Sequence, residues 1–137
     1  MSGPPNPIPM RAIPAALAVV IGLGIGIAGA QEGNPDEGAE VFKKCRACHD
    51  VGPEAKNKVG PVLTGILGRT AGTIEGFTYS DANKQAGAKG LVWTDEILFK
   101  YLDSPLTFMP GTKMAFAGLK DAQDRKDVIA YLKKFAK

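Results

Sequence analysis

The sequence predicts a small all-α protein in which short helices are joined by long loops. Several segments carry helix-capping residues followed by apolar residues at helical spacing. No segment favours a long strand, because residues 50–79 contain six glycines and two prolines, which break regular structure. With 137 residues, of which 45% are hydrophobic and 23% charged, the chain has room for one compact domain.

The first predicted helix starts near residue 35. Asn34 is a typical N-cap, Pro35 suits the first helical position, and the acids that follow face the positive end of the helix dipole. An apolar face then continues at i, i+3, i+4 and i+7 through Gly38, Val41, Phe42 and Cys45, and on to Cys48 and His49. We therefore expect the cysteine motif to close this helix.

The remaining helices are predicted in the second half of the chain. Ser80 caps a short helix that continues to about residue 86, and Thr94 caps another that ends at Asp103-Ser104-Pro105. Asp121 opens a terminal helix with apolar residues at helical spacing. The loop of residues 50–79 is long for so small a domain unless it wraps something, and a flat apolar cofactor fits that role.

The N-terminus has the pattern of an export segment. Residues 12–30 carry no charge, follow Arg11, and end in the small residues Ala28-Gly29-Ala30 that a signal peptidase reads. Residues 1–30 are interpreted as a signal peptide cleaved after Ala30, with Met10 as an alternative start, which leaves residues 31–137 as the mature domain. The alternative is an uncleaved membrane anchor, because this apolar run is about the minimum that spans a bilayer.

The composition excludes several functions. The net charge is only +3, and the basic residues do not cluster with aromatic residues, so nucleic-acid binding is not expected. Two cysteines and one histidine cannot complete a structural zinc site of four Cys or His ligands.

Residues 45–49 form a Cys-x-x-Cys-His motif, the attachment signature of c-type haem. Cys45 and Cys48 lie on one face of a helical turn, where each thiol can form a thioether with a haem vinyl group, and His49 then faces the iron. A thioredoxin-like redox pair would need a preceding strand, which the sequence lacks. A disulfide between the two cysteines would close only a tiny loop.

The sixth ligand of the iron separates an electron carrier from an enzyme or sensor. The chain has no second histidine, so the candidates are Met109 and Met114. A thioether ligand favours ferrous iron and raises the reduction potential. An open sixth position would instead suit a haem peroxidase or a gas-binding protein, although the sequence offers no distal histidine for acid-base chemistry.

Several further runs resemble class I cytochromes c, in particular the bacterial cytochromes c2 and the mitochondrial type. The resemblance covers nearly all of residues 34–137. Beyond the haem motif, the matching runs are residues 60–65, 76–84, 110–114, 116–118 and 128–134. It implies the class I cytochrome c fold, one covalent haem c, and electron transfer rather than catalysis.

The resemblance also implies residue roles. Met114 would ligate the iron opposite His49, and the Pro61 carbonyl would accept a hydrogen bond from the ligating imidazole. The residues implied to hold the haem propionates are Arg69, Tyr79 and Trp93. Those implied to form a polar cluster on the methionine side are Asn83, Tyr101 and Thr112. Phe116 would cover the haem edge. Asn57 stands where many relatives carry a histidine.

The expected partners are redox complexes with acidic docking surfaces, namely a donor of the cytochrome bc1 type and an oxidase or reaction centre as acceptor. The protein is expected to act as a monomer in the periplasm, or to be anchored facing the periplasm if the leader is retained. The lysines expected around the haem edge are Lys44, Lys56, Lys58, Lys113 and Lys120. Leu106, Thr107 and Asp121 replace lysines that relatives carry, so the surface is less basic than in the most cationic of them.

Overall fold

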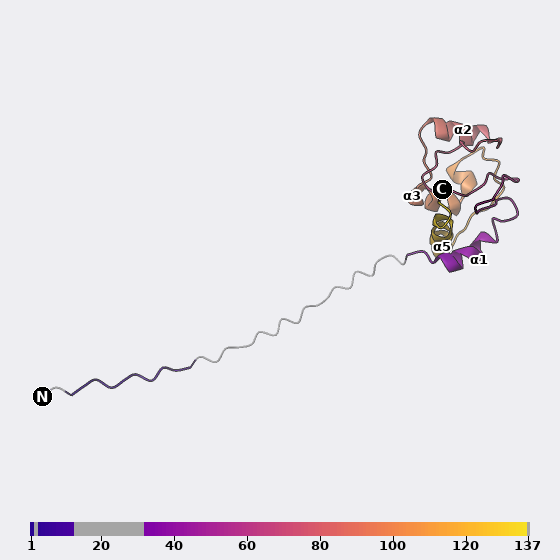
Figure 1. The fold of residues 1–137 in the computed structure, drawn as a ribbon. Coiled ribbons are helices and arrows are strands. Elements are labelled where there is room, and N and C mark those ends of the chain that lie inside the picture. The colour runs from indigo at the N-terminus through magenta and orange to yellow at the C-terminus, as the bar shows by residue number, and fades with distance from the viewer. Residues whose placement is uncertain (2, 13–31, 137) are drawn as a thin grey trace.

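The computed structural model describes residues 1, 3–12 and 32–136. It contains five helices, namely α1 (Pro35–Phe42), α2 (Asp81–Ala88), α3 (Asp95–Asp103), α4 (Pro105–Phe108) and α5 (Ala122–Lys133). Long loops join them (Figure 1), and extended pairing within the described residues is limited to one bridge between Thr70 and Val92. The all-α prediction is confirmed, whereas the predicted signal peptidase site lies outside the described residues.

Helix α1 starts as its cap predicts but ends earlier than expected. The Asn34 side chain accepts hydrogen bonds from the backbone N–H groups of Asp36 and Glu37. The helix ends at Phe42, and the cysteine motif follows in hydrogen-bonded turns, with Cys45 N donating to Phe42 O at 2.8 Å. The periodicity carries through these turns, because turns of three or four residues keep the same face inward.

Helices α1 and α5 cross at close range and join the two ends of the domain. A Cβ at Gly38 would lie 2.0 Å from the Asp127 carbonyl oxygen, so only glycine fits there. Asn34 N donates to the buried Asp127 carboxylate at 2.8 Å, and the rings of Phe42 and Tyr131 pack 5.3 Å apart. Figure 1 shows α1 and α5 adjacent at the lower end of the domain.

The other helices begin at the caps that the sequence predicts. Ser80, Thr94 and Asp121 each accept hydrogen bonds from backbone N–H groups in the first turn of α2, α3 and α5. Helix α4 is an addition, because Pro105, expected only to end α3, also starts this single turn. Within the described parts of the chain, no helix combines the length and apolar character needed to cross a membrane.

Candidate functional site

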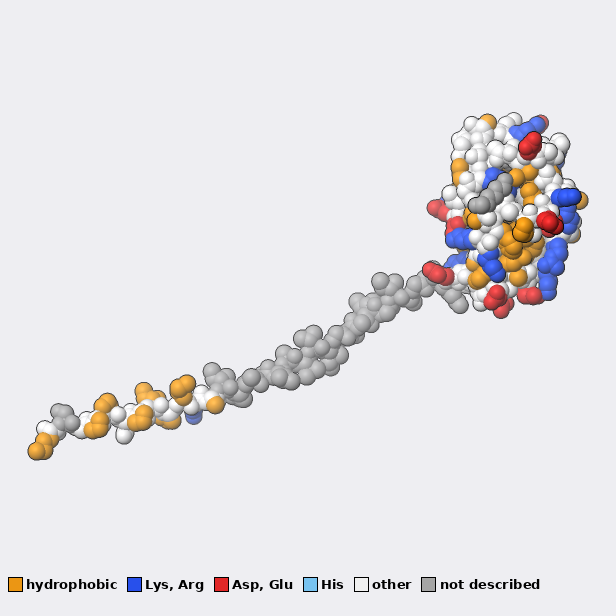
Figure 2. Space-filling model, in the orientation of Figure 1, with side chains coloured by type: hydrophobic (Ala, Val, Ile, Leu, Met, Phe, Trp, Pro, Cys, Tyr) orange, Lys and Arg blue, Asp and Glu red, His pale blue; other side chains and the backbone are white. Residues whose placement is uncertain are grey.

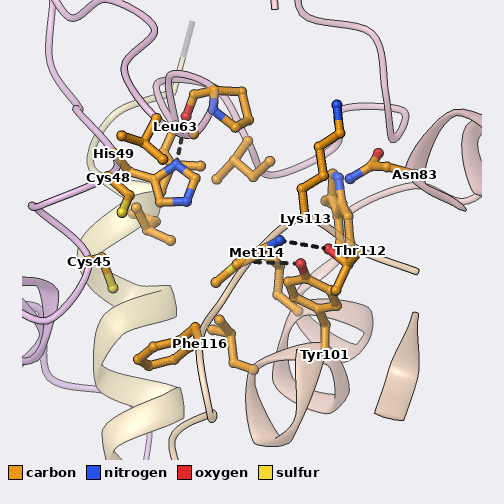
Figure 3. A pocket seen from close by; sticks show the side chains of 18 of the residues that line it. Cys45, Cys48, His49, Leu63, Asn83, Tyr101, Thr112, Lys113, Met114 and Phe116 are labelled. Atoms are coloured by element: carbon orange, nitrogen blue, oxygen red, sulfur yellow. Dashed lines mark hydrogen bonds between the residues drawn. The ribbon is translucent and has the colours of Figure 1, made fainter. Parts of the chain in front are cut away.

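A cavity of about 440 Å³ lies at the centre of the domain. All twelve residues that the sequence analysis assigned to the site line it, and Figure 3 shows several of them. Its apolar wall comes from three helices and the long loop, namely Phe42 of α1, Leu63 and Ile66 of the loop, Leu98 and Leu102 of α3, and Val128 and Leu132 of α5. The volume and mostly apolar lining suit a flat organic cofactor.

His49 forms one side of the cavity. The side chain is 8% exposed, and its Nδ1 lies 2.7 Å from the Pro61 carbonyl oxygen. A carbonyl only accepts hydrogen bonds, so Nδ1 carries the proton and Nε2 keeps a free lone pair. Burial lowers the pKa of His49, which keeps the imidazole neutral and able to bind a metal.

Gly60 permits this position of the imidazole. A Cβ at Gly60 would lie 2.3 Å from His49 Cε1, which is too close for any side chain to fit. The sequence analysis did not include Gly60 among the site residues. The signal available for it was the Gly-Pro pair within the loop, which indicates a close backbone approach but not its partner.

Cys45 and Cys48 lie on the same side of the cavity as His49 (Figure 3). Both are free thiols, Cys45 half-buried and Cys48 exposed. Burial raises the pKa of Cys45 to about 11, so its thiol is protonated at neutral pH. The two cysteines and the imidazole line one wall of the cavity. Attachment of a c-type haem requires this arrangement.

Met114 faces His49 from across the cavity (Figure 3). Its Sδ accepts a hydrogen bond from Tyr101 Oη at 3.2 Å, and its backbone N–H donates to Thr112 Oγ1 at 3.2 Å. Burial raises the pKa of Tyr101, so the phenol stays protonated as the donor. Met109, the other candidate, is 5% exposed in the core and does not line the cavity.

Polar side chains also line the cavity. The Arg69 guanidinium donates to the carbonyl oxygens of Val62 and Thr64 at 2.9 and 2.7 Å. Tyr79 Oη accepts from Ile74 N at 3.1 Å, and Trp93 is buried beside the Tyr101 ring. Asn83 Oδ1 is buried and has no hydrogen-bond partner within the described parts of the chain, which fits a site for a group with polar substituents.

Comparison with known proteins places this site in a family. The sequence model described as Cytochrome c matches residues 35–136. The chain belongs to the cytochrome c family. Cytochrome c2 of Blastochloris viridis is 52% identical over 113 residues, covering 82% of this chain and 87% of that protein. Cytochrome c-550 of Ancylobacter novellus is 59% identical over 101 residues, covering 74% and 94%.

A solved structure supports the same assignment. Cytochrome c2 from Rhodospirillum centenum superposes with a TM-score of 0.74 at 50% identity, covering 77% of this chain and all of that one. The protein is thus a class I cytochrome c that carries one covalently bound haem c. It transfers electrons to and from redox partner proteins and is not an enzyme, and the matches do not favour a peroxidase or gas-binding function.

Proposed function

We propose that His49 and Met114 are the axial ligands of the haem iron and that Cys45 and Cys48 carry the thioether bonds. The observation that carries the proposal is the pairing of His49 and Met114 on opposite sides of one cavity. The lone pair on His49 Nε2 and the Met114 thioether are both donors that haem iron accepts. When bound, haem c supplies an iron that gains or loses one electron without any change in a substrate bond.

The surrounding residues hold these ligands and exclude water. Pro61 orients the imidazole through its carbonyl, and Tyr101 and Thr112 hold Met114 through its sulfur and backbone N–H. We assign the haem propionates to Arg69, Tyr79 and Trp93, because buried carboxylates need hydrogen-bond donors. Asn83 completes the polar cluster, and Phe116 covers the haem edge. A rigid and dry site limits the reorganisation that accompanies each electron transfer.

The absorption spectrum of the oxidised wild-type protein tests this ligation. A thioether bound to ferric haem gives a weak sulfur-to-iron charge-transfer band at long wavelength, so we expect that band at neutral pH. Its absence, together with rapid binding of carbon monoxide to the reduced protein, would show that Met114 does not ligate the iron.

We propose further that residues 1–30 direct export to the periplasm and are cleaved after Ala30. The apolar run and the small residues before Gln31 support this proposal. The intact mass of the native protein is expected to equal that of residues 31–137 plus one haem. A detergent-requiring species that retains residues 12–30 would instead establish a membrane anchor with the same redox chemistry.

We propose that the protein acts as a monomer. Its proposed partners are a donor of the cytochrome bc1 type and an oxidase or reaction centre as acceptor, each with acidic groups around its docking site.

The lysines expected around the haem edge differ in whether an acidic side chain lies near them. Lys44 lies 3.9 Å from Asp124, and Lys120 lies 3.8 Å from Asp103. Lys113 lines the cavity and makes no ion pair with the described residues. On the face in view, Figure 2 shows basic and acidic side chains interspersed.

This difference predicts unequal effects of charge reversal. Lys113→Glu is expected to slow the reaction with an acidic partner complex several-fold at low salt, with the deficit closing as salt screens the charges. Lys44→Glu is expected to slow the same reaction less, because the Lys44 side chain is directed toward Asp124 rather than left to face a partner. Stopped-flow rates at several ionic strengths measure both variants. Equal rates for wild type and Lys113→Glu at low salt would show that docking depends on apolar contact instead.

A further inference from the structure

The Pro61–Val62 peptide group is hydrogen-bonded at both ends. Its carbonyl oxygen lies 2.7 Å from His49 Nδ1, and its N–H donates to Asn57 Oδ1 at 2.9 Å. Because the peptide unit is planar, a side chain that holds the N–H also fixes the direction of the carbonyl. Pro61 has no N–H of its own with which to anchor this segment.

Asn57 uses both ends of its amide. Oδ1 accepts from Val62 N, and Nδ2 donates to the Glu75 carbonyl oxygen at 3.2 Å, 18 residues along the chain. The two partners set the orientation of the amide, since one is a donor and the other an acceptor. A continuous chain of hydrogen bonds therefore connects His49, the Pro61–Val62 peptide, Asn57 and Glu75.

Other side chains hold the same loop at different points. Arg69 donates to the carbonyl oxygens of Val62 and Thr64, and Thr64 Oγ1 exchanges hydrogen bonds with the backbone of Gly52. These contacts fix the segment after the Pro61–Val62 peptide. Asn57 is the side chain that bonds to the very peptide group facing the imidazole, and hydrogen bonds in such a chain strengthen one another.

We propose that Asn57 is a positioning residue for the iron-ligating imidazole, acting through the Pro61–Val62 peptide group. The proposal rests on the ligation by His49 proposed above. A hydrogen bond from the imidazole N–H to a carbonyl fixes the ring orientation and raises the basicity of the ligand. A more basic imidazole favours ferric iron, so loosening this bond raises the reduction potential.

Three variants of the haem-loaded protein test the proposal. Asn57→Ala removes both amide bonds, and Asn57→Asp keeps an acceptor for Val62 N but no donor to Glu75. Thr73→Val is the matched control, because it removes a 2.7 Å hydrogen bond to the Thr70 carbonyl that does not touch the Pro61–Val62 peptide. Nuclear magnetic resonance of the reduced protein measures solvent exchange of the His49 Nδ1 proton, and redox titration of the alanine and valine variants measures the potential.

Asn57→Ala is expected to exchange the Nδ1 proton several-fold faster than wild type. It is also expected to raise the reduced-to-oxidised ratio several-fold against a fixed reference couple. Asn57→Asp should retain slow exchange, and Thr73→Val should match wild type in exchange and potential. Unchanged exchange and potential in Asn57→Ala would overturn the proposal, as would equally fast exchange in Asn57→Asp. The paramagnetically shifted ring resonances of His49 in the oxidised wild-type protein separately report whether His49 ligates the iron.

Discussion

Replacement of Met114 by alanine is expected to abolish the sulfur-to-iron charge-transfer band and to lower the reduction potential. A thioether ligand favours ferrous iron, so loss of the ligand that we propose stabilises the ferric state. Differences in axial ligands set the reduction potentials of haem proteins over a range of about 0.8 V. The fall in potential is expected to be a sizeable part of that range. Tyr101 also loses the sulfur that its hydroxyl contacts at 3.2 Å. An absorption spectrum and a redox titration of the oxidised variant measure both effects.

Met109→Ala provides the matched control. Met109 is a core residue, 5% exposed and outside the cavity lining. Its truncation should lower the free energy of unfolding by about 2–5 kcal/mol, the range for a buried methionine, while the band persists. A band that survives in Met114→Ala and disappears in Met109→Ala would reverse the assignment of the ligand.

The local features of this protein were predictable from the sequence because neighbours along the chain create them. Asn34, Ser80, Thr94 and Asp121 cap helices by bonding to backbone groups two or three residues away. The haem motif is equally local, since its cysteines and histidine lie within five consecutive positions. Such patterns require no knowledge of how distant segments pack.

Features that depend on distant segments were not predictable in the same way. The close approach of Gly60 to His49 and the bond from Asn57 to Glu75 arise only when the loop of residues 50–79 folds back on itself. The ion pair of Lys44 with Asp124 likewise joins the first and last parts of the domain. In the sequence Lys44 is therefore indistinguishable from an unpaired lysine, although the fold places an acidic side chain beside it.

Where a helix ends also depends on how distant segments pack. The apolar periodicity continues past Phe42, yet the chain leaves the α-helix there for tighter turns that bring the cysteines and His49 to one wall of the cavity. At Pro105 the missing N–H ends one helix but suits the first position of the next, and the sequence alone favoured only the first outcome.

Gly38→Ala is expected to destabilise the fold strongly, although alanine favours a helix by about 1 kcal/mol over glycine. The new Cβ would lie 2.0 Å from the Asp127 carbonyl oxygen and 2.7 Å from Tyr131 Cβ. The clash involves the backbone of α5, which cannot rotate away as a flexible side chain could. Helices α1 and α5 must separate, and overpacking of this kind costs about 3 kcal/mol or more, which exceeds the gain in helix propensity.

Separation of these helices also reaches the haem site, because Phe42 on α1 and Val128 and Leu132 on α5 line the cavity. We therefore expect the reduction potential to fall as well, since water entering the site favours the more highly charged ferric state. Glu37→Ala is the control on the exposed side of α1 and should cost less than about 1 kcal/mol. Urea unfolding and redox titration compare the variants. A urea unfolding midpoint for Gly38→Ala equal to or above that of wild type would show that the α5 backbone can shift to accommodate the new Cβ. The contact between α1 and α5 would then not be what holds the wall of the haem cavity in place.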